Sequence, residues 1–156
     1  MLAWDYARTG QSLAINTTIG AESKINMTGI EATPLREDEV HVWIASLDCR
    51  QSDLRFFEST LAEDEIKRAN RFYFQNHREW FIAGRGLLRV ILSSYLGLPP
   101  GEIIFTYGNR GKPELRAEDG RSAIEFNLAH SAGTAIFALT RDRAVGVDIE
   151  SFQPDF

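Results

Sequence analysis

Cysteine is nearly absent from this sequence, and that scarcity narrows the chemistry open to it. Cys49 is the only cysteine among 156 residues, so the chain has no internal disulfide. It also lacks a second cysteine or a histidine at the spacing of a zinc or redox motif. We therefore expect a reducing, cytoplasmic environment and a buried, unreactive thiol.

Long apolar runs are also missing. No stretch approaches the roughly 20 apolar residues that a membrane-spanning helix needs. The first residues, MLAWDYARTG, do not combine a basic start with an apolar segment, as a secretory signal would. The sequence therefore predicts a cytoplasmic protein with no membrane partner.

An excess of positive charge is missing as well. The 17 Lys and Arg residues are outnumbered by 22 Asp and Glu, which gives a net charge of −5 and argues against general nucleic-acid binding. Six of the 17 basic residues nevertheless lie between Lys67 and Arg89. This local cluster is either an anion site or a solvated helix face.

The composition fits one compact domain, with 44% hydrophobic and 25% charged residues. Residues 1–36 are rich in Thr, Asn, Gly and Ser and show no sustained periodicity. We expect them to form a loose N-terminal extension. Residues 37–156 are expected to form the folded domain.

Hydrophobic periodicity predicts the first elements of that domain. Apolar residues alternate over residues 40–47, which predicts a strand. Thr60 and Glu63 have the spacing of a capping box, in which each side chain satisfies a free backbone amide at a helix start. A short helix is therefore expected from there to about residue 70.

A long helix should follow. Asn76 and Glu79 repeat the capping signal, and apolar residues then recur at helical spacing as far as Gly97. The fold class predicted is α+β, with this long helix packed on a small antiparallel sheet. Further strands are predicted at residues 103–107, 126–131, 135–140 and 144–150, the last two joined as a β-hairpin.

Two acidic residues share one face of the last predicted strand. In the segment VGVDIE, a period of two puts Asp148 and Glu150 side by side. Neighbouring carboxylates repel unless something neutralises them, and Mg²⁺ accepts oxygen ligands from one or two carboxylates together with phosphates. The alternative is a polar strand face at the surface.

Arginines form a stripe along the long predicted helix. Arg78, Arg85 and Arg89 are spaced by seven and four residues, with Lys67 and Arg68 on the preceding helix. The forked guanidinium group suits phosphate. From the residues alone, the stripe is either a phosphate site or a solvated face.

A glycine loop and a histidine offer two further candidates. Gly111, Lys112 and Pro113 are not the end of a phosphate-binding loop of the Walker type, which needs Ser or Thr after the lysine. The loop is either an anion contact or a plain turn between strands. His130 follows an apolar stretch and is either structural or functional.

Taken in order, these segments resemble the Sfp-type 4′-phosphopantetheinyl transferases. The matching segments are RFY at 71–73, AGRGLLR at 83–89, GKP at 111–113, FNLAHS at 126–131 and GVDIE at 146–150. The resemblance covers roughly residues 36–152. It is specific because the motifs occur in the family's order and spacing.

The resemblance implies a Mg²⁺-dependent transferase. Such an enzyme moves the 4′-phosphopantetheine arm of coenzyme A to a serine of an apo acyl or peptidyl carrier protein and releases adenosine 3′,5′-bisphosphate. Asp148 and Glu150 match the family's catalytic metal ligands. The residues that match coenzyme A contacts are Arg68, Arg85, Gly111, Lys112, Pro113 and His130.

Members of that family continue into a similar second half, which carries a W-x-x-K-E-A motif. By resemblance, this chain is the N-terminal half of a fold with two-fold pseudo-symmetry, truncated before that motif. We expect it to be incomplete alone and to self-associate or pair with a second half. The alternatives are a catalytically inactive half that binds coenzyme A or a carrier protein, and a structural half of a two-chain enzyme.

Overall fold

The structure is a computed structural model that describes residues 12–19, 34–116 and 124–152. Along these parts of the chain two strands are followed by the helices, and four further strands follow the helices. The strands are β1 (Ser12–Ile19), β2 (Glu39–Ser46), β3 (Phe105–Tyr107), β4 (Pro113–Leu115), β5 (Ile124–Ser131) and β6 (Thr134–Arg141). The helices are α1 (Gln51–Thr60), α2 (Glu63–Ala69), α3 (Gln75–Leu96) and the short 3-10 helix η1 (Pro100–Glu102).

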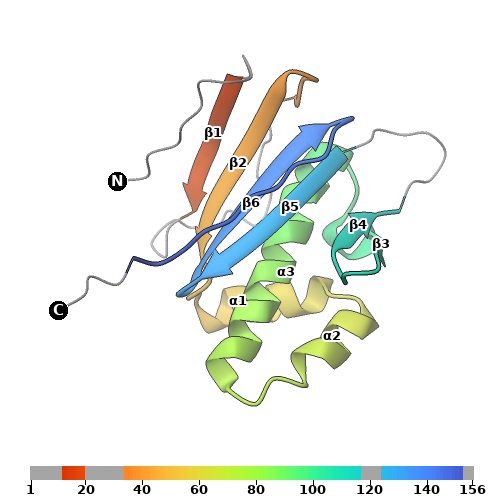
Figure 1. The fold of residues 1–156 in the computed structure, drawn as a ribbon. Coiled ribbons are helices and arrows are strands. Elements are labelled where there is room, and N and C mark those ends of the chain that lie inside the picture. The colour runs from red at the N-terminus through yellow and green to blue at the C-terminus, as the bar shows by residue number, and fades with distance from the viewer. Residues whose placement is uncertain (1–11, 20–33, 117–123, 153–156) are drawn as a thin grey trace.

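A four-stranded sheet in the order β1-β2-β6-β5 organises the fold. β6 is antiparallel to both of its neighbours, whereas β1 runs parallel to β2. Figure 1 shows the long helix α3 behind this sheet, with α1 and α2 towards one end of it. The predicted α+β class, a long helix on a small sheet that is antiparallel except at β1, is confirmed.

The hydrophobic core lies between α3 and one face of the sheet. Trp43 on β2, Phe137 on β6 and Phe126 on β5 are buried there against Ile82 and Leu88 of α3. The period of two in the strands and of 3.6 in the helix turns these side chains to a common interior. Burying each one contributes roughly 1.5–3 kcal/mol.

β5 and β6 form a hairpin through the two-residue turn Ala132–Gly133, whose φ angles are 46° and 75°. Two positive φ angles define the type I′ turn that matches the twist of paired strands. The hairpin predicted between residues 135–140 and 144–150 is wrong, because residues 144–150 form no strand. Ala-Gly lacks the Asn-Gly or Asp-Gly signature by which such turns are recognised.

The segment after β6 runs back along the outer face of this hairpin. Thr140 Oγ1 donates a hydrogen bond to the carbonyl of Arg143 (2.6 Å), and Ser151 N donates one to Ser131 Oγ (3.2 Å). Ser131 and Thr140 lie at opposite ends of the hairpin. In Figure 1 the segment passes in front of the sheet, while α3 lies behind it.

The start of α2 differs from its prediction. Thr60 is the last residue of α1, a helix that the sequence analysis did not predict, and its hydroxyl donates to the carbonyl of Phe57 (2.7 Å). The free amide before α2 belongs to Ala62, which donates to Glu65 Oε2 (2.9 Å). The capping box predicted at Thr60 is therefore wrong, because that hydroxyl is already bonded within α1.

The prediction of α3 is confirmed apart from its first residues. The helix follows Phe74, so Asn76 is inside it and not its cap. The end at Gly97 is as predicted: its φ of 66° is left-handed, and its N–H donates to the carbonyl of Ser93 (2.9 Å). None of the helices among the described residues is long and apolar enough to span a bilayer.

The predicted loose extension, residues 1–36, includes one strand that the sequence analysis did not predict. Residues 12–19 pair with β2 in parallel. Residues 1–11 and 20–33 lie outside the described parts of the chain. A strand of this kind depends on a partner distant in sequence, which local periodicity does not reveal. The domain boundary near residue 36 stays a prediction.

Gly86 is required where α3 crosses α1. A Cβ built at Gly86 would lie 2.6 Å from Cγ and Cδ1 of Phe57, whereas one at Gly84 would meet Leu47 Cδ2 at 3.7 Å. We expect Gly86→Ala to destabilise the fold by about 1–3 kcal/mol or more through overpacking. Gly84→Ala should be neutral or stabilising by up to about 1 kcal/mol, because alanine favours helix. Urea unfolding of both variants tests the difference; equal midpoints would contradict it.

Cys49 should react slowly at neutral pH. Burial, assisted by the neighbouring Asp53 and Glu79, raises the pKa of the Cys49 thiol to about 11. The neutral thiol then persists well above pH 8, and the thiolate is the reactive form. Alkylation by iodoacetamide, followed by mass spectrometry, should keep accelerating up to about pH 11 in the folded protein. In urea it should level off near pH 9, as for a free thiol with a pKa of about 8.5; a plateau near pH 9 in both would contradict the prediction.

Candidate functional site

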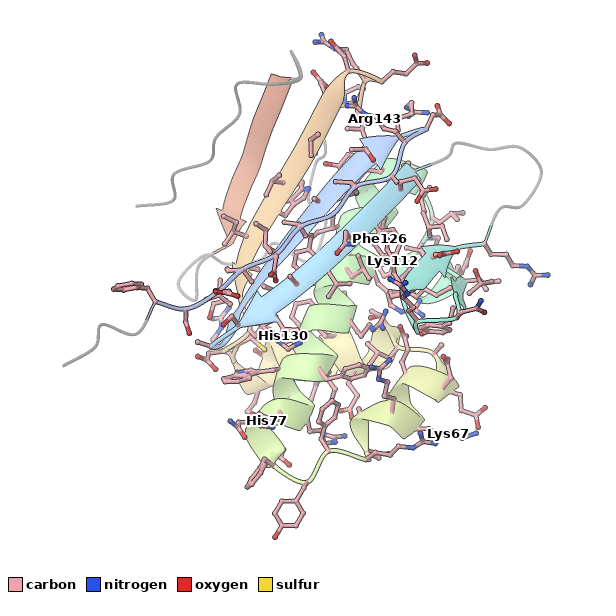
Figure 2. The ribbon with its side chains drawn as sticks, in the orientation of Figure 1. Lys67, His77, Lys112, Phe126, His130 and Arg143 are labelled. Carbon is pink, nitrogen blue, oxygen red and sulfur yellow. The ribbon has the colours of Figure 1, made fainter. Side chains whose placement is uncertain are left out.

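A groove of about 310 Å³ opens between α2, α3 and the end of β5. Three residues that the sequence analysis named as candidates, Arg68, Arg85 and His130, come together in its wall. Figure 2 shows two histidines of the groove, His77 on α3 and His130 at the end of β5. Its lining consists of Leu47, Arg68, Phe72, His77, Trp80, Phe81, Gly84, Arg85, Leu128, His130 and Ala135.

Arg85 is the buried cation of this groove, with 7% of its surface exposed. Its guanidinium carbon lies 5.6, 5.9 and 5.8 Å from the ring centres of Phe81, Phe105 and Tyr107. Among the described residues its Nη1 has no hydrogen-bond partner. Burial lowers the pKa of Arg85, against the opposing effects of Tyr107 and Glu65. Arg85 therefore has one buried donor that no group of the described residues satisfies.

The three arginines of the predicted stripe have different environments. Arg89 is fully buried, and its Nη2 lies 2.7 Å from Glu65 Oε2. Its Nη1 also donates to the carbonyls of Pro100 and Ile103. Arg78 is paired with Glu58 at 2.6 Å. The stripe was expected to be either a phosphate site or a solvated face. Arg89 is neither, because its guanidinium group is buried and bonded within the protein.

Arg68 also approaches the Phe81 ring, with its guanidinium carbon 5.4 Å from the ring centre. It also lines a second, larger hollow of about 570 Å³ with Asp64, Lys67, Arg71 and Phe72. Lys67 itself is paired with Glu63 at 2.6 Å on the exposed surface of α2. Arg68 and Phe72 are thus common to both hollows.

Gly111 and Lys112 lie in the turn of the β3–β4 hairpin, and Pro113 is the first residue of β4. Gly111 has a φ of 71°, and its N–H donates to the carbonyl of Gly108 (2.8 Å). Pro113 pairs with Tyr107, whose ring faces Arg85. The hairpin therefore connects to the groove through Tyr107, and Figure 2 shows Lys112 on it beside β5.

The acidic pair lies on the outer side of the sheet, outside the lining of the groove. Asp148 and Glu150 are exposed, and Val147 and Ile149 between and before them are half-buried. The alternation predicted from the sequence is thus present without a strand. Asp148 Oδ1 accepts a hydrogen bond from the N–H of Ile149 (2.9 Å), and neither carboxylate has an ion-pair partner in the part of the chain that the structure describes.

Oxygen donors of this kind fit a hard divalent cation. In the described ranges, no group of three or more His, Cys, Asp or Glu could hold a metal. The pair would therefore supply two ligands of a site completed by other oxygens. The hydrogen bond from Ser151 to Ser131 holds the acidic segment at the same end of β5 as His130.

Sequence reasoning missed the aromatic side of the groove. Trp80 belongs to the apolar stripe from which the long helix is predicted, yet it is only partly buried, lines the groove and donates from Nε1 to Asp48 Oδ1 (2.7 Å). His77 lies 5.7 Å from its ring. Apolar residues recur along a helix in the same way whether they face the core or a groove. The sequence therefore contains no signal that assigns Trp80 and Phe81 to the groove.

Comparison with known proteins gives one consistent result. Residues 46–141 match the family described as 4′-phosphopantetheinyl transferase, N-terminal. This span includes every candidate site residue except Asp148 and Glu150. The matched part is more than half of the chain.

Individual relatives agree with the family match. The chain is 48% identical over 120 residues to the 4′-phosphopantetheinyl transferase HetI of Nostoc sp., covering 77% of this chain and 51% of that protein. It is 40% identical over 77 residues to the 4′-phosphopantetheinyl transferase AcpT of Escherichia coli O157:H7, covering 49% and 34%. A phosphopantetheinyl transferase of Thraustochytrium sp. is 32% identical over 96 residues, covering 62% and 33%. The chain thus spans about half, or less, of the curated relatives it matches.

Two arginines on α3 should differ sharply in their effect on stability. Arg89→Met would leave the Glu65 carboxylate buried without its partner and is expected to destabilise the fold by about 3–5 kcal/mol. Arg78→Met removes a partly exposed pair with Glu58 and should cost at most about 1 kcal/mol. Urea unfolding followed by tryptophan fluorescence measures both. Similar losses in the two variants would show that the buried pair is not special.

Proposed function

The chain belongs to the 4′-phosphopantetheinyl transferase family, and on that basis we propose that it takes part in moving the 4′-phosphopantetheine arm of coenzyme A to a serine of an apo acyl or peptidyl carrier protein. Because the chain spans about half of HetI, we propose that it supplies one wall of the active site. A second half, from another chain or a second copy, would supply the other.

One observation carries the proposal: Arg85, a buried residue that lines the groove, has an Nη1 donor without a hydrogen-bond partner among the described residues. A buried guanidinium with an unused donor is suited to a phosphate oxygen, since its fork matches that geometry. Arg68 and His130 line the same groove and add positive charge or hydrogen-bond donors. We propose that these residues hold the phosphates of coenzyme A. Gly111, Lys112 and Pro113 would contact it from the β3–β4 hairpin.

The proposed reaction is a phosphoryl transfer. The serine oxygen of the carrier attacks the phosphorus that bears the pantetheine arm and forms a new P–O bond. The bond between that phosphorus and the bridging oxygen breaks, and its electron pair leaves with adenosine 3′,5′-bisphosphate. The serine gives up its proton, which passes to water or to the leaving adenosine 3′,5′-bisphosphate. Cationic groups that neutralise charge building up on the phosphate oxygens lower the barrier to this step.

Asp148 and Glu150 are the residues that would hold Mg²⁺. Their exposed, unpaired oxygens suit that ion. When bound, Mg²⁺ neutralises negative charge on the pyrophosphate. The carboxylates themselves would keep the metal at the end of β5, near His130, through the hydrogen bond between Ser151 and Ser131.

Location and partners follow from the same proposal. Coenzyme A and the apo carrier protein are the proposed partners, with a second half of the fold or a second copy of this chain completing the cleft. The lone cysteine, which has no partner for an internal disulfide, supports a location in the reducing cytoplasm.

The proposal is tested by coenzyme A binding with and without Mg²⁺, measured by calorimetry. We expect Mg²⁺ to tighten binding and Asp148→Asn to remove at least tenfold of that gain, because a metal ligand is lost. Asp142→Asn is the matched control, since it removes an exposed carboxylate from the same segment. Equal effects of both substitutions, or no binding of coenzyme A, would contradict the proposal.

Transfer is measured separately, by mass spectrometry of an apo carrier protein incubated with the chain, coenzyme A and Mg²⁺. A gain of the phosphopantetheine mass would show that the chain is active by itself. Mg²⁺-dependent binding without that gain would instead identify an inactive half that binds coenzyme A, or one that needs its second half.

A further inference from the structure

Glu65 uses its two carboxylate oxygens unequally. Oε2 accepts hydrogen bonds from Arg89 Nε (2.9 Å) and from Ala62 N (2.9 Å), and it lies 2.7 Å from Arg89 Nη2. Oε1 has no hydrogen-bond partner among the described residues. The hydrogen bonds of Glu65 are therefore committed to Arg89 and the start of α2.

Arg85 is the second guanidinium beside this carboxylate, and it is held differently. Its Nε lies 4.0 Å from Glu65 Oε1, too far for a hydrogen bond but close enough for charge attraction. The side chains of Glu65, Arg89 and Arg85 are 1%, 1% and 8% exposed. One carboxylate thus faces two guanidinium groups, and the buried cluster carries one uncompensated positive charge.

An uncompensated buried charge is costly, so its retention needs a reason. Arg85 lines the groove, and its buried Nη1 has no hydrogen-bond partner within the described part of the chain. An anion bound in the groove at Arg85 would therefore balance the extra positive charge of the cluster. A phosphate group has the charge and the oxygen geometry to do so.

We propose that Glu65 is the resident counter-ion of an anion subsite at Arg85, which takes one phosphate group of the ligand. The inference rests on the proposed function only in identifying that phosphate as part of coenzyme A. Glu65 partly balances the buried charge of Arg85 and forms no hydrogen bond with its Nη1. The bound phosphate then supplies the negative charge that Glu65 alone does not.

Glu65 consequently has opposite effects on folding and on binding. Its charge stabilises the folded cluster but also partly neutralises the site that attracts the anion. Arg85 has the opposite pair of effects: its buried charge attracts the anion and does not stabilise the folded protein. If Arg85 were merely structural, its removal would destabilise the protein as the removal of Arg89 does.

The experiment is thermal unfolding of the 156-residue chain in sodium chloride and in inorganic pyrophosphate at equal ionic strength. For the wild type, pyrophosphate at about 100 times its Kd should raise Tm by about 5–10 °C. Arg85→Met should melt in chloride no lower than the wild type and should lose this rise. A clearly lower Tm for Arg85→Met, or an undiminished rise, overturns the proposal.

Glu65→Gln should melt lower than the wild type in chloride but gain more from pyrophosphate, with an affinity tighter by about tenfold or more because the competing charge is gone. Glu63→Gln is the matched control on the same helix, and it should behave as the wild type in both salts. A rise for Glu65→Gln that is no larger than that of the wild type overturns the role of Glu65. If Glu65→Gln fails to fold, the Arg85→Met comparison still decides the proposal.

Pyrophosphate is used as the probe because its result does not depend on coenzyme A. A response to pyrophosphate through Arg85 without binding of coenzyme A would refute the proposed function and leave this inference standing. Coenzyme A binding that is unchanged in both Arg85→Met and Glu65→Gln would overturn this inference together with the phosphate contact proposed for Arg85, and it would leave coenzyme A binding itself established.

Discussion

The buried ion pair between Glu65 and Arg89 fixes how the two helices beside the groove, α2 and α3, lie against each other. Arg89 on α3 reaches α2 through Glu65 and the turn at η1 through the carbonyls of Pro100 and Ile103. Three elements that would otherwise meet only through apolar contacts are thereby joined at one point. Hydrogen bonds to charged groups are directional, so they define how α2 lies against α3 better than apolar packing does. Arg68 and Arg85 approach the same aromatic ring because of that alignment.

The parts of the fold that were predicted correctly have local causes. Strands β2 and β6 and the helix α3 follow from apolar alternation and helical stripes, which are properties of neighbouring residues. Distant contacts account for the failures. The hydroxyl of Thr60 bonds within α1 and caps nothing. β1 forms only because β2 lies beside it, and residues 144–150 follow the hairpin surface without joining the ladder.

Three of the predicted site residues lie together in the groove, and the others, Gly111, Lys112, Pro113, Asp148 and Glu150, lie outside its lining. The order of the motifs singled out Arg68, Arg85 and His130, and all three line one groove. Glu65 on α2 determines which arginine of the stripe is held in an ion pair and which keeps an unpaired donor. Glu65 and the stripe lie on different helices. No periodicity within α3 contains that information. The exposed acidic pair was foreseen from its spacing alone, since alternation survives in an extended segment without a strand.

His130 is directed by the same alternation that builds the core. On β5, Ile124 and Phe126 are buried against α3, and Leu128 and His130 follow at steps of two into the groove. The tight Ala132–Gly133 turn fixes the register of β5 on β6, so a slip of one residue would expel Phe126 from the core. Mutations that keep the core folded therefore also keep His130 aimed at the groove. The strand register that buries Phe126 also sets the orientation of the His130 side chain, so no further contact is needed to direct it.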